Sequence, residues 1–67
     1  MPRNVEIRVR GTLPAGAAER LGLTAAVESA DTVLRGPVAD QQDLHGILAR
    51  LQDMGLELVE FRQLPEV

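Results

Sequence analysis

Polar and apolar residues alternate strictly between Asn4 and Arg10, with Val5, Ile7 and Val9 on one side of the chain. A period of two residues is typical of a strand with one face buried, so this segment is predicted to be the first strand. Residues 14–21 then predict a short helix, because proline suits a first helical turn and glycine follows at position 22.

Two shorter segments, 23–28 and 32–35, predict a second and a third strand joined by a tight turn. Gly36 and Pro37 are expected to end the third strand, since proline cannot continue the hydrogen-bonded ladder of a central strand. A last strand is predicted at residues 56–62, before a polar tail.

The strongest local pattern predicts a capped amphipathic helix that begins after Asp40 and ends at Gly55. Asp40 is a good N-cap residue, and Asp43 occupies the position of the acidic partner in a capping box. Gly55 can adopt the left-handed conformation that ends a helix, which lets Leu56 fold back on Leu51. The apolar positions recur at helical spacing, on a face formed by Leu44, Ile47, Leu48, Leu51 and Met54.

The predicted order, β-α-β-β-α-β over residues 1–67, fits a single α+β domain of the ferredoxin-like type. Such a domain has a four-stranded antiparallel sheet with both helices on one face. Right-handed connections would place the first and third strands in the centre and the second and fourth at the edges. The last strand has apolar residues on both faces from Leu58 to Phe61. This pattern indicates either a site for pairing with another copy or an edge that associates non-specifically.

Composition narrows the possible functions of this 67-residue chain. Its net charge is −3 and its only aromatic residue is Phe61, which argues against nucleic-acid binding through charge or stacking. One histidine and no cysteine cannot form a standard zinc site, and no cofactor is expected. No signal sequence or membrane-spanning segment is recognisable, so a cytoplasmic location is expected, without membrane association. A core this small favours a homo-oligomer.

One candidate interface or ligand patch lies on the main helix, at Gln42, His45, Gly46 and Ala49. Glycine inside a helix costs about 1 kcal/mol relative to alanine, so Gly46 suggests close approach of a subunit, a protein partner or a ligand. A solvated helix surface that tolerates glycine is the alternative. His45 is the only imidazole that could act as a base or a ligand, although a partly exposed structural histidine is the favoured interpretation.

A candidate anion patch is formed by Arg8, Arg10 and Arg35, which are expected on the outer face of the central strands. Guanidinium groups suit carboxylates and phosphates, but alternation alone also predicts polar residues there, and Glu6 could neutralise one arginine. No catalytic triad is legible, so no catalytic residue is assigned and an enzyme is not the favoured interpretation.

Residues 36–58 resemble a group of small uncharacterised bacterial proteins. The shared pattern is G-P-V-x-D-Q-x-x-L-H-G-x-L-x-R-L-x-D-x-G-L-x-L, with Met54 where leucine is more usual. The resemblance implies a small stand-alone protein and assigns no catalytic residue. The order of elements also resembles that of ACT-type regulatory domains, which bind small ligands at subunit interfaces, but fold alone does not define function.

Two functions remain after these observations. The first is a small non-catalytic interaction or regulatory module that associates with itself. The second is a small ligand-binding or catalytic dimer, in which His45 and the arginines of the sheet line a shared cleft.

Overall fold

The computed structural model describes residues 3–65, which form four strands and two helices. The elements are β1 (Arg3–Arg10), α1 (Ala17–Arg20), β2 (Thr24–Glu28), β3 (Asp31–Val38), α2 (Gln41–Asp53) and β4 (Glu57–Gln63). Every pair of neighbouring strands is antiparallel, and the order across the sheet is β2-β3-β1-β4. The predicted α+β class, with a four-stranded antiparallel sheet and two helices, is confirmed.

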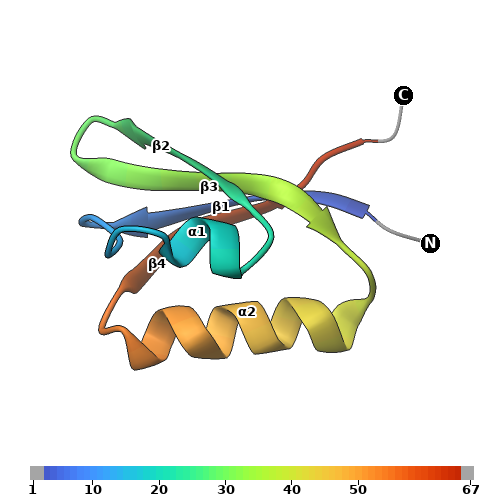
Figure 1. The fold of residues 1–67 in the computed structure, drawn as a ribbon. Helices are drawn as coiled ribbons and strands as arrows, with labels where there is room; N and C mark the ends of the chain where they lie inside the picture. The colour runs from blue at the N-terminus through green and yellow to red at the C-terminus, as the bar shows by residue number, and fades with distance from the viewer. Residues whose placement is uncertain (1–2, 66–67) are drawn as a thin grey trace.

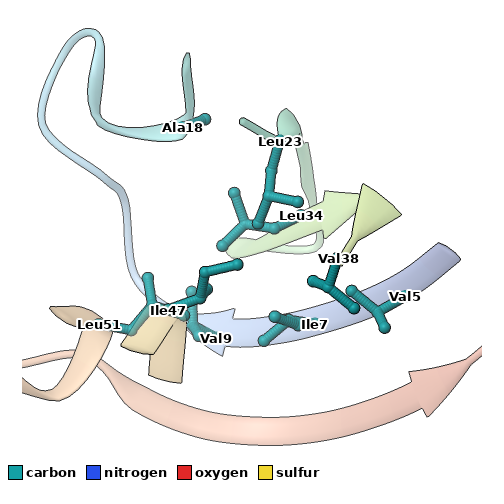
Figure 2. Packing of buried hydrophobic residues seen from close by; sticks show 9 residues of the cluster. All are labelled: Val5, Ile7, Val9, Ala18, Leu23, Leu34, Val38, Ile47 and Leu51. Atoms are coloured by element: carbon teal, nitrogen blue, oxygen red, sulfur yellow. The ribbon is translucent and has the colours of Figure 1, made fainter. Parts of the chain in front are cut away.

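Both helices lie on the same side of the sheet, and α2 runs along its length (Figure 1). The core forms between them, because alternate residues of β1 point toward the helices (Figure 2). Ile7 and Val9 of β1 are fully buried, and Leu34 of β3 lies directly across from Ile7. Ile47 and Leu51 of α2 belong to the same cluster and pack against it from the helix side. The opposite face of the sheet, called the open face below, carries the intervening polar residues.

Helix α2 begins and ends as its sequence predicts. The backbone N–H of Asp43 donates to Oδ1 of Asp40 at 2.8 Å, which satisfies one of the unpaired donors of the first turn. At the other end Gly55 has a φ of 78°, and the N–H of Leu56 donates to the carbonyl of Leu51 at 3.1 Å. These contacts form a Schellman motif, so the boundaries of α2 are set locally.

The first helix is shorter than predicted. It covers only Ala17–Arg20, because Gly16 has a φ of 81°, which is incompatible with a helix interior. Pro14 therefore precedes the helix, and its carbonyl accepts a hydrogen bond from the N–H of Ala17 at 3.1 Å. The prediction of a helix over residues 14–21 was wrong in its first turn.

Strand β3 continues past the proline that was expected to end it. It runs to Val38, and Pro37 pairs with Asn4 of β1. The pairing with β2 ends at Arg35, opposite Thr24, so beyond that point β3 has a partner on one side only. Proline is tolerated there because its missing N–H deprives no second neighbour of a hydrogen bond.

The apolar face of α2 is narrower than its periodicity predicts. Ile47 and Leu51 are buried, while Leu44 and Leu48 are partly exposed at the edge of the core. Met54 is 37 % exposed, because it follows the last helical residue and lies beyond the sheet-facing stripe. The same helix therefore has a buried row and a neighbouring row that is available at the surface.

The turn between β2 and β3 carries backbone strain. Glu28 pairs with Asp31, and the two residues between them, Ser29 and Ala30, have φ values of 50° and 69°. Two consecutive residues with positive φ form the turn that matches strand twist, but asparagine and glycine are the residues that adopt it easily.

Replacing Ala30 by glycine should therefore raise the free energy of unfolding by about 1 kcal/mol, since a Cβ is unfavourable in the left-handed region. Urea denaturation followed by circular dichroism measures the change. Ala26→Gly is a matched control in the extended part of β2, and it should lower stability by roughly 0.5–1 kcal/mol. If both variants lower the free energy of unfolding by the same amount, the turn is not strained at Ala30.

Candidate interaction site

The exposed edge of the sheet at β4 carries most of the large apolar side chains that face solvent. Leu58 is 49 % exposed, Val59 is 44 % exposed and Phe61 is 39 % exposed. Strand β4 pairs only with β1, so its other edge presents backbone groups without a neighbouring strand. A bulge interrupts the pairing at Val59, because Leu58 lies opposite Val9 whereas Glu60 lies opposite Arg8. Exposed apolar edges of this kind are typical of association sites.

A groove of about 220 Å³ lies beside this edge, between α2 and β4. Its lining is largely apolar and comprises Val9, His45, Leu48, Ala49, Leu51, Gln52, Leu56 and Leu58. The partly exposed row of α2 thus meets the exposed side of β4. Helix and strand together form one continuous apolar surface.

The four residues of the candidate patch are all exposed on α2, and their spacing of three and four positions makes them neighbours on one side of the helix. His45 and Ala49, one helical turn apart, line the groove next to β4. Gln42 and Gly46 line a separate hollow toward α1, together with Arg50. An added Cβ at Gly46 would meet no atom within 4 Å, so this glycine is not required by packing within the described chain. The four residues therefore form one exposed helix surface that lies between the groove and the hollow.

The three arginines of the candidate anion patch do share the open face, as predicted, but each contacts carboxylates. The ion pairs are Arg8 with Glu28 (3.3 Å) and Asp31 (3.6 Å), Arg10 with Glu57 (3.2 Å), and Arg35 with Glu6 (2.7 Å) and Glu28 (3.4 Å). These carboxylates come from other strands of the sheet and neutralise the arginines, which weakens the attraction for a free anion.

His45 lies on the helix-covered side of the sheet, whereas the arginines lie on the open face. One protomer therefore does not bring the imidazole and the guanidinium groups into a common cleft. A shared cleft of the kind considered from the sequence would need a second copy to supply one of the two.

Glu6 is the centre of the ion-pair network on the open face. Its carboxylate accepts a 2.7 Å hydrogen bond from Nε of Arg35 and lies 3.7 Å from Nε of Arg62. The hydrogen bond from Arg35 lowers the pKa of Glu6 below its ordinary value of 4.5, and the charges of Arg35, Arg62 and Arg8 add to this effect. The alternation of polar residues on β1 indicated this face, but the cross-strand partners depend on register.

This lowered pKa predicts a specific pH dependence of stability. Because the folded state holds Glu6 ionised more strongly than the unfolded state does, the stabilisation is complete above the unfolded pKa near 4.5. It is lost as the pH falls through the lower pKa of the folded state. Glu6→Gln should lower the melting temperature at neutral pH and reduce its dependence on pH below 4.5.

Melting temperatures measured by circular dichroism from pH 2 to pH 7 test this prediction. Glu57→Gln is the control, because its ion pair with Arg10 is mostly exposed and contributes little. An acid transition that is identical in the Glu6→Gln variant and in the unaltered protein would contradict the role of Glu6.

Within residues 3–65, no cluster of three histidine, cysteine or acidic side chains has the geometry to hold a metal ion. None of the helices in the same segment is long and apolar enough to span a membrane.

The geometry defines a small α+β domain whose most distinctive surface is an apolar sheet edge beside a half-exposed helix. A family model described as a domain of unknown function (DUF8691) matches residues 4–62, and the chain belongs to this family. No curated protein and no solved structure matches the chain. Family membership agrees with the resemblance to an uncharacterised group, and it assigns no chemistry to any residue.

Proposed function

We propose that this domain is a small non-catalytic interaction module that associates with a second copy of itself. The observation that carries the proposal is the apolar edge of β4, where Leu58, Val59 and Phe61 are each more than a third exposed. Leu58 also lines the groove along α2, so a partner that covers the edge at Leu58 also covers the helix.

The proposal includes a ferredoxin-like fold, supported by the strand order β2-β3-β1-β4 and by the placement of both helices on one face. It also includes the pattern of residues 36–58 as a signature of the family, supported by a family match that spans the segment.

Association also has an energetic reason. The described chain exposes 4617 Å² of surface, and a stable interface covers about 800 Å² on each partner. Such an interface would remove about one sixth of the surface from solvent. Each square ångström of apolar surface buried contributes about 25 cal/mol, which adds to a core that is small for an independent domain.

The test is the solution mass, measured by light scattering over a concentration series. We expect a dimer for the unaltered protein and a monomer for Leu58→Asp, because a carboxylate in a buried interface is strongly unfavourable. Val27→Asp is the matched control: Val27 is 66 % exposed on the opposite edge strand, β2, so this variant should remain dimeric. A monomer at all concentrations, or an unchanged mass for Leu58→Asp, would overturn the proposal.

The ligand-binding alternative has one supporting observation, which is the presence of His45 and Gln52 beside the apolar floor of the groove. Polar groups beside an apolar surface are typical of small-molecule sites. An NMR titration of His45 distinguishes the two functions. A pKa far from that of an exposed histidine would favour a ligand site or catalysis.

A further inference from the structure

We infer that the second copy joins edge to edge, through antiparallel pairing of β4 with the partner's β4 around a two-fold axis at Phe61. This inference rests on the proposed self-association and specifies its partner surface and register. It is supported by the charges and faces of three consecutive residues, Glu60, Phe61 and Arg62.

The pairing of β4 with β1 determines which way these side chains point. Phe61 lies opposite the buried Ile7, so it is on the helix-covered side of the sheet, where it lines a hollow with Leu44. Glu60 lies opposite Arg8 and therefore points to the open face. Arg62 lies opposite Glu6 and points the same way. Glu60 and Arg62 thus flank Phe61 in sequence, and their opposite charges share the open face, whereas Phe61 lies on the helix-covered side.

A two-fold axis at Phe61 makes this segment complementary to itself. Facing residues in antiparallel strands lie on the same side of the sheet, and their numbers have a constant sum. With Phe61 opposite the partner's Phe61, Glu60 lies opposite the partner's Arg62, and Arg62 lies opposite the partner's Glu60. The two aromatic rings meet on the helix-covered side, while two ion pairs of opposite charge form on the open face.

The neighbouring symmetric registers are unfavourable. An axis at Glu60 would oppose two glutamates, and an axis at Arg62 would oppose two arginines, so like charges would face each other in both. An axis at Val59 would place the bulge in the middle of the new ladder. The axis at Phe61 keeps the regular part of β4 in the ladder and pairs opposite charges.

The side chains on the open face are also available for these contacts. Among the described residues Glu60 takes part in no ion pair, and Arg62 reaches only Glu6, at 3.7 Å. Arg8 and Arg35, in contrast, each contact two carboxylates at 3.6 Å or less. Glu60 and Arg62 are therefore available for ion pairs with a partner across the edge.

Cysteine cross-linking tests the register directly, because the chain contains no cysteine of its own. Only a residue on a two-fold axis faces its own copy, at a Cβ separation of about 4.5–5.5 Å, which is close to disulfide geometry. Phe61→Cys should therefore give a disulfide-linked dimer under mild oxidation. Val59→Cys is the control, since it would face the partner's Gln63 and lie about 14 Å from its own copy.

A charge exchange tests the ion pairs independently of cross-linking. Glu60→Arg and Arg62→Glu should each raise the dimer dissociation constant about tenfold, because both create two pairs of like charge. Mixing the two variants should restore association as a heterodimer, in which opposite charges face each other again. Glu57→Arg makes the same change outside the five facing residues 59–63, and it should leave the constant unchanged. Circular dichroism verifies that each variant is folded.

The outcomes separate this inference from the proposed function. A dimer that cross-links through Val59→Cys and not through Phe61→Cys would overturn the register and leave self-association standing. If the mixed variants form no heterodimer although the unaltered protein is dimeric, the register is overturned as well, and self-association still stands. An unaltered protein that stays monomeric at all concentrations would overturn both.

Discussion

Leu51→Ala should lower the free energy of unfolding by about 2–5 kcal/mol. Leu51 is only 2 % exposed, and it belongs to the cluster that joins α2 to Val9 and Leu34 of the sheet. Truncation removes apolar contacts and leaves a cavity that the surrounding strands can fill only in part. Because a domain of 67 residues has a total stability of roughly 3–10 kcal/mol, this loss removes a large part of it.

Leu48→Ala is the matched control, since it makes the same truncation three residues away on the same helix. Leu48 is partly exposed and lines the groove beside Leu58, so the loss should be clearly smaller than for Leu51. Urea denaturation followed by circular dichroism gives both values. A larger loss for Leu48→Ala would mean that α2 is rotated relative to the sheet.

Gly36→Ala should also destabilise the domain, by about 1–3 kcal/mol. A Cβ at this position in β3 would lie 2.7 Å from Cδ2 of Leu23 and 3.1 Å from the carbonyl oxygen of Gly22. Leu23 is buried, and the carbonyl belongs to the backbone of the connection from α1 to β2, so neither atom can move freely. The close approach of this connection to β3 therefore requires glycine.

Gly46→Ala should have the opposite effect on the free energy of unfolding, and urea denaturation measures both variants. Gly46 is exposed within α2, and an added Cβ would meet no atom within 4 Å. Alanine should raise the free energy of unfolding by about 1 kcal/mol, because it favours the helical conformation. A loss of stability at Gly46, or a gain at Gly36, would contradict the packing described for that position.

The association site shows how far the sequence could predict function. The last strand was recognised as apolar on both faces, and the structure exposes Leu58, Val59 and Phe61. The bulge at Val59 and the groove against α2 were not predicted, because both depend on how β4 aligns with β1. The patch at Gln42, His45, Gly46 and Ala49 was predicted as one surface, and all four residues are exposed on α2, between the groove next to β4 and the hollow toward α1.

The open face gives a similar result. Alternation along β1 predicted that Arg8 and Arg10 would share a face, and the structure agrees. Their acidic partners Glu28, Asp31 and Glu57 lie 20 to 47 positions away in sequence, and they come close only because the strands assemble into one sheet. A candidate site for anions is thus occupied by the protein's own carboxylates.

By itself the sequence determined the local features of this protein. The alternation of β1, the cap at Asp40 and the ending at Gly55 depend on a few neighbouring residues, which act through side-chain periodicity, hydrogen bonds and backbone conformation. Tertiary structure decided the shortened α1, the extension of β3 past Pro37 and the ion pairs of the open face. These features depend on which strands become neighbours and in what register, because contacts between distant segments determine where each backbone group and charge finds its partner.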